Sequence, residues 1–508
     1  MVEHAIDAVS PYTAIQNHVQ VVAGGTDDSS SNTLHIRQSA STRQNNNDDD
    51  AADDHSSNNT FDLSKFDEIV VVAFGKASAS MATALVQQLV TTTTTENSNK
   101  NNDGIARKLS GCVICKDDHA TPEEIEFLTT NHKIPIRYAS HPVPDERSNA
   151  AAVKVLDLVR SKASPTTLVL CCISGGGSAL FCAPQPPLTL KDLQEVNSVL
   201  LQSGMGIEQM NVIRKRLEQG KGGKLAAAAY PSTVQTFVLS DVLGDPLDLI
   251  ASGPTVPDTS SWQDALYLID QYDLESKFSS QVMEYLNNNG PSNDDDDSEE
   301  AATEQNQVFA KVSTTLVGNN ELAVLAAASK AKELGYTPQI LGTHIEGEAK
   351  EIPHVYVGMA KYLQEQAARG GDSNGVKLPV ALIAGGETTV KLPSNPGKGG
   401  RNQELALSAA LLLDKLKLRN IVVCSVGTDG TDGPTDAAGA VVDGSTVSSS
   451  LEEARKAMSD HNAYPYLESL TEELSSSTSS GSGPLLRTGP TGTNVADVCV
   501  ILVHPREQ

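Results

Sequence analysis

Short apolar runs alternate with longer amphipathic stretches over most of the 508-residue chain. The apolar runs, rich in Val, Ile and Leu, cover residues 68–74, 111–115, 167–173, 234–239, 309–316, 379–384, 420–426 and 496–503. Apolar residues near helical spacing cover 3–20, 76–90, 146–162, 189–202, 207–218, 319–334, 348–368 and 401–413. Continuous apolar runs are typical of strands buried on both faces. Their alternation with helices predicts an α/β fold with largely parallel sheets.

Four tracts rich in Ser, Asn, Asp and Thr interrupt this pattern. They occupy residues 22–60, 91–104, 289–306 and 471–484. Such segments bury too little apolar surface to order themselves, so we expect insertions without fixed structure. The chain is longer than one hydrophobic core supports. The acidic tract 289–306 is the best boundary, which predicts a larger domain over 1–305 and a smaller α/β domain over 306–508.

The charge balance limits the classes of partner. The chain has 38 basic and 64 acidic residues and a net charge of −26, which repels nucleic acid and anionic membranes. No apolar stretch approaches the ~18 residues of a membrane span, and the early acidic residues Glu3 and Asp7 oppose a signal or transit peptide. Seven cysteines, an odd number, favour buried thiols in a reducing compartment. We expect a cytoplasmic protein without nucleic-acid or membrane partners.

The first candidate for chemistry lies where a predicted strand ends. The run 68–74 leads through Gly75 to Lys76, at the start of the next predicted helix. Parallel α/β sheets bind ligands outside the carboxyl ends of their strands. Lys76 is a point charge suited to a phosphate or carboxylate. Cations are disfavoured at helix N-termini, so this position favours a function over a solvated surface lysine.

A triple glycine follows the strand predicted over 167–173. The loop consists of Ser174, Gly175, Gly176, Gly177 and Ser178. Glycines let the backbone approach an anion closely, and free N–H groups can bind its oxygens. The phosphate-loop pattern GxxxxGK[ST] is absent from the chain, and Leu180 stands where a dinucleotide fingerprint has its third glycine. The loop therefore predicts an anion site without naming the ligand.

Two further segments of the N-terminal half carry candidate groups. Lys221, Gly222 and Gly223 precede an Ala-rich helix and form a plausible second anion site, although some cations of this region are expected on a solvated helix face. Asp241 follows the strand predicted over 234–239, where a carboxylate suits a general base or a metal contact. A turn or helix cap explains Asp241 equally well from spacing alone.

A glycine-rich loop in the C-terminal half leads into a helix that opens with Arg401 and Asn402. Arginine offers a bidentate fork for phosphate or carboxylate, and the helix start adds N–H donors. Glu387, after the apolar run 379–384, could hold a metal ion. This cluster is the densest functional signal in the C-terminal half.

Three aspartates follow the strand predicted over 420–426. They are Asp429, Asp432 and Asp436. Oxygen-rich loops of this kind suit Mg²⁺. The twelfth position from Asp429 is Ala440, so the loop is not an EF-hand, and a turn with Asx caps is the alternative. The strand-end position favours a metal-binding function. A last loop, 488–497, is a candidate to close the pocket that contains these aspartates.

Together these segments resemble the glycerate kinase family whose C-terminal half is called the MOFRL domain. The resemblance runs from residue 5 to the final strand, includes His141-Pro142-Val143-Pro144-Asp145, and is interrupted only by the low-complexity tracts. It implies a larger Rossmann-like, three-layer α/β/α domain and a smaller α/β domain, with the active site in the cleft between them. It also implies transfer of the ATP γ-phosphoryl group to D-glycerate, at the 2-hydroxyl, giving 2-phosphoglycerate.

Carried over by motif, the resemblance makes Lys76 and Arg401 the catalytic cations and Asp241 the carboxylate near the substrate. Phosphoryl transfer independently requires positioning and charge neutralisation, which suits Asp241 as base or orienting acceptor. Mg²⁺ usually takes one or two protein carboxylates beside phosphates, so Glu387 and one aspartate of the loop 429–436 would suffice. The sequence leaves open which loop binds ATP phosphates and which binds glycerate. It also leaves open whether the protein is a monomer or a homodimer.

Three alternatives stay open. The phosphate could go to the 3-hydroxyl. A hydroxypyruvate reductase, a name attached to relatives of this family, would need a nicotinamide site, against which Leu180 counts. A non-catalytic sugar-phosphate-binding regulator would need phosphate loops alone, whereas the set Lys76, Asp241 and Arg401 fits an enzyme better.

Overall fold

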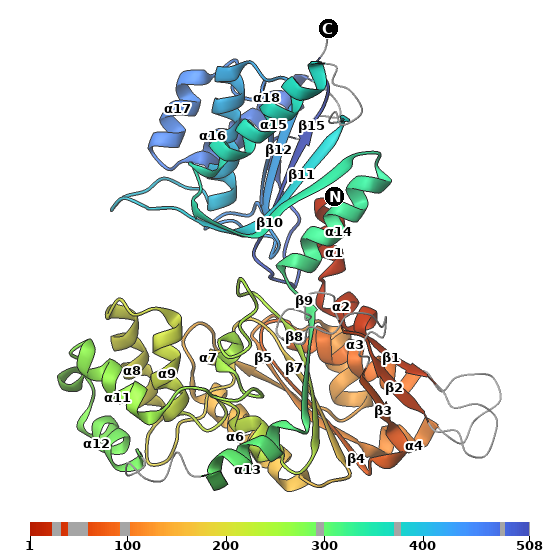
Figure 1. The fold of residues 1–508 in the computed structure, drawn as a ribbon, viewed down its shortest axis with the longest axis vertical. Helices are drawn as coiled ribbons and strands as arrows, with labels where there is room; N and C mark the ends of the chain where they lie inside the picture. Colours follow the sequence, from red (N-terminus) through yellow and green to blue (C-terminus); the bar gives the residue numbers. More distant parts are fainter. Residues whose placement is uncertain are drawn as a thin grey trace. The chain divides into compact units, whose positions relative to one another are not determined.

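The computed structural model (Figure 1) describes residues 1–22, 32–38, 59–91, 102–290, 299–369, 377–477 and 483–506. The chain forms two compact units. Unit 1 comprises residues 1–10, 241–244 and 318–508, and unit 2 comprises residues 11–240 and 245–317. The units are therefore not consecutive halves of the sequence. No helix among the described residues is both long and apolar enough to cross a lipid bilayer.

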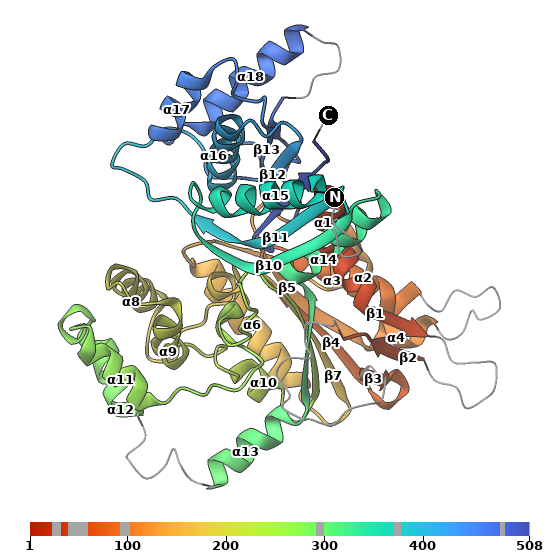
Figure 2. The same cartoon turned by 45° about the horizontal axis from the view of Figure 1, so that its top comes forward.

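Unit 2 is built on a six-stranded sheet in the order β6-β5-β4-β7-β8-β9. The strands are β4 (Glu68–Phe74), β5 (Leu109–Lys116), β6 (Ile136–Ala139), β7 (Thr167–Ile173), β8 (Thr233–Leu239) and β9 (Val312–Gly318). The pairings from β6 through β8 are parallel. In chain order this is 3-2-1-4-5-6, the order of dinucleotide-binding Rossmann sheets, which confirms the Rossmann-like prediction. The order reverses between β4 and β7, which lie side by side (Figure 2).

Helices cover this sheet in two groups. One group has α3 packed with α2, α4 and α5, and the other has α6 packed with α10. Their bounds are α2 (Pro11–His18), α3 (Ser78–Thr91), α4 (Asn102–Lys108), α5 (Pro122–Ile125), α6 (Glu146–Lys162) and α10 (Lys224–Ala229). Parallel crossovers are right-handed. Helices on the path to β5 and β6 therefore take one face and helices on the path to β7 and β8 the other, which gives three layers.

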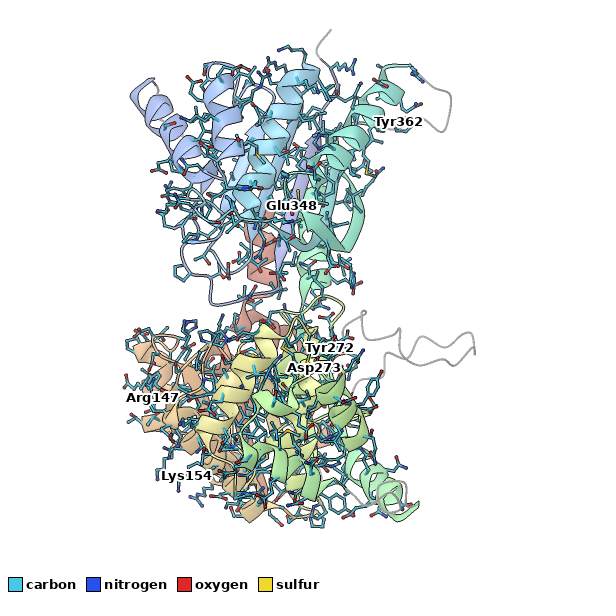
Figure 3. The ribbon with its side chains drawn as sticks, turned by 90° about the vertical axis from the view of Figure 1, so that its left-hand side faces the viewer. Arg147, Lys154, Tyr272, Asp273, Glu348 and Tyr362 are labelled. Carbon is cyan, nitrogen blue, oxygen red and sulfur yellow. The ribbon has the colours of Figure 1, made fainter. Side chains whose placement is uncertain are left out.

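The helix α6 shows how the sequence pattern sets this packing. It begins after Asp145, whose carboxylate accepts the Ser148 N–H over 3.0 Å as an N-cap. Its apolar side, including Val155, is buried. Arg147 and Lys154 lie on its outer side (Figure 3). The predicted bounds, 146–162, match the helix.

A helical subdomain and a small sheet complete unit 2. The subdomain has α8 (Leu190–Gln202), α9 (Ile207–Leu217), α11 (Trp262–Gln271) and α12 (Ser280–Asn289), which share an apolar core of their own. The small sheet is antiparallel, with β1 (Val19–Val22), β2 (Thr33–Ile36) and β3 (Asn59–Asp62). Short elements include α7 (Gly177–Leu180) and α13 (Glu299–Phe309).

Unit 1 has a six-stranded sheet of a different kind, in the order β10-β11-β15-β12-β13-β14. The strands are β10 (Thr337–Glu348), β11 (Val380–Thr389), β12 (Ile421–Gly427), β13 (Gly439–Asp443), β14 (Leu485–Leu486) and β15 (Asp497–Val503). Only β10 and β11 pair in parallel. The last strand, β15, lies antiparallel between β11 and β12. The prediction of largely parallel sheets is therefore wrong for this unit, because a strand from the chain end is inserted at its centre.

The helices of unit 1 are α1 (Val2–Ala8), α14 (Asn320–Glu333), α15 (Ile352–Ala368), α16 (Arg401–Leu416), α17 (Leu451–Ser459) and α18 (Ala463–Ser477). The first residues of the chain belong here because α1 packs on α14 and Thr493 Oγ1 donates to Val9 O over 2.7 Å. The helix α16 lies against β12 and β13, with Leu407 and Leu413 fully buried.

The structure revises the predicted boundaries. The division expected at 305/306 falls inside α13, and unit 2 continues to residue 317 because β9 joins its sheet. The tract 22–60 contains β2, whose Leu34 and Ile36 are fully buried, so the expectation of an unstructured insertion is wrong there. Helices also take up residues 102–104, 299–306 and 471–477. The cores of the four tracts lie outside the described residues.

Candidate active site

The carboxyl ends of β4 and β7 carry the first two candidate segments, and the structure brings these segments together. The Lys76 N–H donates to Gly175 O over 2.9 Å, and the Ala77 N–H donates to Ser174 Oγ over 3.0 Å. A Cβ on Gly75, whose φ is +125°, would lie 2.2 Å from Ser174 Oγ. Only glycine allows the two loops to meet so closely. Lys76 and the triple glycine therefore share one site, which we call the switch-point site.

The triple glycine presents backbone donors beside Lys76. The Gly177 N–H donates to Ser174 O over 3.3 Å. In the part of the chain that the structure describes, no hydrogen bond uses the N–H of Gly175 or Gly176. Gly176 has a φ of +79°, and successive N–H groups in such a turn form an anion-binding concavity. The geometry thus fits the predicted anion site.

Basic side chains surround the switch-point site. Burial lowers the pKa of His141 to about 4, with the charges of Lys76 and Lys116 acting in the same direction. Burial and the charges of both lysines also lower the pKa of His119. Both imidazoles are therefore neutral at pH 7, and the lysines supply the positive charge. Within the described ranges, no ion pair or side-chain hydrogen bond engages the Lys76 ammonium.

The predicted second anion loop, residues 221–223, has a different environment. Lys221 is 2% exposed, and its ammonium pairs with Glu218 and donates to Ser178 O over 2.8 Å. The N–H groups of Gly222 and Gly223 donate to neighbouring carbonyls over 3.0 and 2.7 Å. Because these donors are already engaged, the geometry favours a supporting role for the switch-point loop over direct anion binding.

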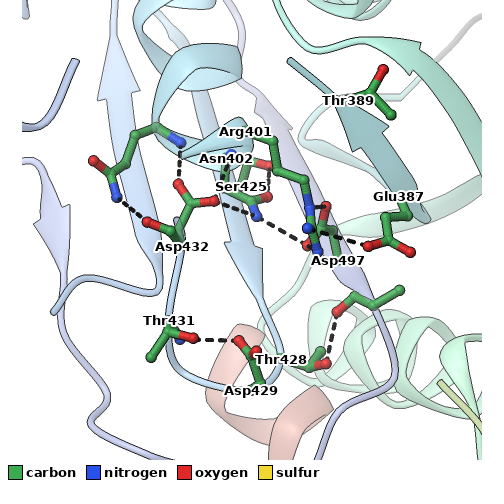
Figure 4. A network of polar contacts seen from close by, with 12 residues as sticks. Glu387, Thr389, Arg401, Asn402, Ser425, Thr428, Asp429, Thr431, Asp432 and Asp497 are labelled. Carbon is green, nitrogen blue, oxygen red and sulfur yellow. Dashed lines mark hydrogen bonds and ion pairs between the residues drawn. The ribbon is translucent and has the colours of Figure 1, made fainter. Parts of the chain in front are cut away.

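Arg401 opens α16, and two carboxylates bind its guanidinium (Figure 4). Nε and Nη2 donate to the two oxygens of Asp497 over 2.6 and 2.9 Å, and Nη1 lies 3.2 Å from Glu387 Oε1. Asp497 stands opposite Gly386 on β11 and Gly427 on β12. The two hydrogen bonds to Asp497 use two of the five N–H donors of a guanidinium, so donors are left for a ligand beside the ion pair with Glu387.

Asp432 caps α16. One of its oxygens accepts the Asn402 N–H over 3.1 Å and the other accepts the Gln403 N–H over 2.8 Å, donors that have no partner inside the helix. Burial raises the pKa of Asp432 to about 6. The Asn402 side chain donates to Asp497 Oδ1 over 3.0 Å and accepts from Ser425 Oγ over 2.6 Å. Asn402 and Asp432 therefore fix the first turn of α16.

Carboxylates outnumber the cation in this network. Burial raises the pKa of Asp497, and the bond to Arg401 opposes that rise. Burial also raises the pKa of Glu387; Arg401 opposes it, and the charges of Asp497, Asp241 and Asp429 add to it. Asp241, which belongs to unit 1, is therefore near Glu387. The structure thus brings three predicted residues, Asp241, Glu387 and Arg401, into one region.

Asp436 lies apart from this network. Its carboxylate accepts from the Tyr464 O–H over 2.6 Å and from Arg487 Nε over 3.0 Å, and these bonds lower its pKa. Among the residues that the structure describes, no three His, Cys, Asp or Glu side chains form a group that could hold a metal ion by themselves. Of the four predicted metal ligands, Glu387 and Asp429 remain candidates for an ion shared with a ligand.

Sequence analysis assigned no role to Asp497, Lys116 or His141. Asp497 is the one acidic residue at the head of an otherwise apolar run, which was the available signal. Lys116 ends β5 and His141 follows β6, so the strand-end rule that found Lys76 applies to both. The four-residue β6 was not predicted, so His141 was noted only as part of the family motif and received no role of its own.

A pocket of about 570 Å³ opens beside Arg401 within unit 1. The end of β11, the loop 396–400, the segment 432–434 and residues 461–463 line it. His461 lies in this lining, with Nδ1 2.8 Å from Glu404 Oε2. Sequence analysis did not predict this pocket.

The fold and these two regions define a two-unit α/β protein with an anion-binding loop at a Rossmann switch point and an Arg–carboxylate network on a mixed sheet. Residues 1–287 match a family model described as a domain of unknown function, DUF4147, and residues 380–497 match the MOFRL family. The chain is 37% identical over 438 residues to the D-glycerate 2-kinase of Thermotoga maritima, covering 86% of this chain and 91% of that protein. The chain belongs to the glycerate kinase family, MOFRL class, as its sequence motifs predicted.

Two further relatives and a solved structure are similar to this chain over most of its length. The glycerate kinase of Mus musculus is 33% identical over 482 residues, 88% of this chain and 86% of that protein. A crystal structure of the Thermotoga maritima glycerate kinase matches with a TM-score of 0.73 and 33% identity, covering 99% of this chain and 97% of that one. An Agrobacterium vitis protein described as a candidate hydroxypyruvate reductase is 37% identical over 440 residues, 85% of this chain and 99% of that protein.

Proposed function

We propose that this protein is a glycerate kinase that transfers the γ-phosphoryl group of ATP to the 2-hydroxyl of D-glycerate. The proposal is carried by the similarity to a relative named D-glycerate 2-kinase. The two chains are 37% identical over an alignment that covers 91% of that relative. Phosphoryl transfer requires positioned cations and an acceptor for the hydroxyl proton. Lys76, Arg401 and Asp241 are groups of these kinds.

In this proposal the switch-point site binds one anionic group of a substrate. The unpaired Lys76 ammonium supplies the charge, and the N–H groups of Gly175 and Gly176 hold the oxygens. The neutral imidazole of His141 lies against Gly176, where a Cβ would be 2.9 Å from its Cδ2. The His141 ring therefore restricts the orientations in which an anion can bind to the loop. Lys221 supports the loop through its bond to Ser178 O.

Arg401 and Asp241 act on the groups that react. Asp497 orients the guanidinium, whose remaining N–H donors neutralise charge on the phosphoryl group during its transfer. Asp241 accepts the proton of the substrate hydroxyl as that oxygen bonds to phosphorus and the bond to ADP breaks. The effect of Asp241 on the pKa of Glu387 supports its position near Arg401.

Glu387 and Asp429 fit a Mg²⁺ ion carried by the nucleotide. Mg²⁺ usually takes one or two protein carboxylates and completes its shell with phosphate oxygens and water. Burial raises the pKa of Glu387, and the negative charges of Asp497, Asp241 and Asp429 add to that rise. When bound, the ion would neutralise phosphate charge. Asp432 and Asp436 fit less well, because each carboxylate is engaged elsewhere.

A coupled assay tests the reaction and its regiochemistry. ADP release from MgATP and D-glycerate, read through pyruvate kinase and lactate dehydrogenase, reports kinase activity. Enolase then converts only 2-phosphoglycerate to phosphoenolpyruvate. We expect both signals. ADP without phosphoenolpyruvate would move the phosphate to the 3-hydroxyl, and no ADP from a folded, Mg²⁺-replete protein would refute the kinase.

A hydroxypyruvate reductase is the second candidate, favoured by the description of the Agrobacterium vitis relative. The Rossmann strand order is compatible with it, but the loop after β7 has Leu180 in place of a third glycine. NADH or NADPH oxidation with hydroxypyruvate, measured by absorbance, decides between the two reactions. We also infer a cytoplasmic location, because free and mostly buried cysteines are typical of reducing compartments. Fractionation of the source cells checks this inference.

A further inference from the structure

The pocket beside Arg401 is larger than glycerate requires. Its volume of about 570 Å³ lies in the range of sites for cofactor-sized ligands, roughly 300–1,000 Å³. One part of its wall is apolar, with Val390, Leu392, Pro396, Pro434 and Ala463. Arg401, Glu387, Glu404 and His461 supply charged and polar groups to the same lining. An apolar wall with a few polar groups suits a ligand with a flat apolar part and an anionic tail.

Contacts within the chain tie the walls of this pocket together. A Cβ on Gly433 would lie 2.2 Å from Gly399 O, so the two loops meet through their backbones. The Lys398 N–H donates to Asn462 Oδ1 over 2.9 Å, and the Tyr464 N–H donates to Lys398 O over 3.0 Å. A preformed wall lowers the ordering cost of binding.

A buried carboxylate fixes a histidine in the lining. Glu404 is 4% exposed; its Oε2 lies 2.8 Å from His461 Nδ1, and its Oε1 has no hydrogen-bond partner among the described residues. A carboxylate can only accept, so Nδ1 of His461 carries a proton, and in the neutral tautomer with that proton Nε2 is the acceptor. The pocket therefore offers an acceptor to a ligand that has a donor, such as a hydroxyl or an amino group.

We infer that this pocket binds the nucleoside of the phosphoryl donor, an adenine nucleotide, with its phosphates directed to Arg401. The inference rests on the proposed function. The base lies against Leu392, Pro396 and the other apolar residues, and a ribose hydroxyl or the base amino group donates to His461 Nε2. Glu404 is a positioning residue for that imidazole. The switch-point site is then left for the small anionic substrate.

The charges at the phosphate end refine this assignment. Glu387 contacts Arg401 (Figure 4), and Glu346 also lines the pocket. These carboxylates repel a bare polyphosphate. A nucleotide that brings its own divalent cation meets less repulsion, so nucleotide binding is expected to depend on Mg²⁺.

Calorimetric titration of the full-length protein with MgADP, without glycerate, tests the assignment apart from catalysis. Leu392→Asp and His461→Ala should each raise the Kd of MgADP by about 10-fold. Leu392 is 58% exposed, so its replacement should not disturb folding. Leu334→Asp, at 55% exposure, and His354→Ala, from an exposed His–Glu pair, are matched controls expected to leave the Kd unchanged. Omission of Mg²⁺ should weaken ADP binding to the unaltered protein.

Nucleotide analogues identify which group of the ligand donates a hydrogen bond to His461 Nε2. If the ribose donates, 2′-deoxy-ADP or 3′-deoxy-ADP binds the unaltered protein weakly and is insensitive to His461→Ala. If the base amino group donates, IDP, which lacks that group, binds the unaltered protein weakly and is insensitive to His461→Ala. Glu404→Gln should weaken MgADP binding less than His461→Ala, because the amide still orients the ring.

Steady-state kinetics complete the test. The KM for ATP should rise in both pocket variants while the KM for glycerate stays within about twofold. Unchanged MgADP affinity in both variants, or a raised KM for glycerate alone, would overturn the assignment. MgADP binding that is lost only in Lys76→Met would place the nucleotide at the switch-point site instead. Normal MgADP binding without turnover of glycerate would refute the proposed function but not the assignment of the pocket to a nucleotide.

Discussion

The two cationic regions of this protein differ in whether the cation has acidic partners. At the switch-point site, Lys76 stands at a strand end of a parallel sheet with no acidic partner among the described residues, and glycine N–H groups flank it. In unit 1, Arg401 is held on two sides by Asp497 and Glu387. A free charge contributes to ligand binding and little to folding, whereas a paired charge contributes to both. Mutations can separate these roles.

The largest effect is expected from Arg401→Met. Its loss should lower kcat/KM by about 10³-fold, in line with the worth of a cation that stabilises phosphoryl transfer. It should also lower the free energy of unfolding by about 3 kcal/mol, because Asp497 is left buried without its partner. The coupled assay and urea titration measure the two losses. Arg419→Met, from a more exposed pair with Asp414, is the control; full stability in Arg401→Met would contradict the paired role.

A loss of activity without a loss of stability is expected from Lys76→Met. The variant should lose about 10³-fold in kcat/KM, while the free energy of unfolding stays within about 0.5 kcal/mol. The same assay and titration apply, with Lys154→Met on the outer side of α6 as control. A stability loss as large as that of Arg401→Met would erase the contrast between the two regions.

The glycine contact behind Lys76 should matter for stability. In Gly75→Ala the new Cβ would lie 2.2 Å from Ser174 Oγ and 2.6 Å from Ser174 O, at a φ of +125°. We expect a loss of about 3 kcal/mol in the free energy of unfolding, from strain and displacement of the loop. Gly358→Ala, where nothing lies within 4 Å of the new Cβ, should instead stabilise α15 by about 0.5 kcal/mol. Equal effects of the two changes would refute the close contact.

The smallest effects are pH dependences of opposite sign in the two regions. The pKa of buried Asp432, about 6, lies above its unfolded value of about 3.9. The folded protein therefore binds more protons between pH 4 and 6, and stability falls as pH rises through that window, by about 2 kcal/mol. His141, with a pKa of about 4, titrates in the unfolded chain near pH 6.5, so its contribution rises with pH from about 4 to 6.5.

Variants isolate these two groups. The difference in free energy of unfolding between the native protein and Asp432→Asn should fall as pH rises from 4 to 6. The difference between the native protein and His141→Asn should rise over pH 4 to 6.5. Urea titrations at several pH values measure both. Parallel trends in the two differences would show that one of the pKa directions is wrong.

Much of unit 2 could be predicted from the sequence because its central strands are continuously apolar. The runs 68–74 and 167–173 match β4 and β7, and the strand-end rule then located Lys76 and the triple glycine. The edge strand β6 has four residues of mixed burial, and β10, the edge strand of unit 1, has no fully buried residue, so neither produced a clear apolar run. Because β6 was not predicted, the strand-end position of His141 was not recognised.

Unit 1 was harder to predict because its site is assembled across long sequence separations. The chain pattern indicated strands over 379–384, 420–426 and 496–503, but not that the last of them lies between the other two. That insertion places Asp497 between Gly386 and Gly427, beside Arg401. Asp432 was predicted as a metal ligand, and only the structure shows its two oxygens on the first turn of α16.

The sequence by itself determined the α/β class, the family, and the residues Lys76, Asp241 and Arg401 as the groups to examine. These conclusions depend on local periodicity and on motifs, both of which involve residues close together in the sequence. The tertiary structure decided which charges are free and which are paired, and it formed the pocket beside Arg401. Those properties depend on distances between residues far apart in the chain, because burial and Coulomb energies follow spatial separation.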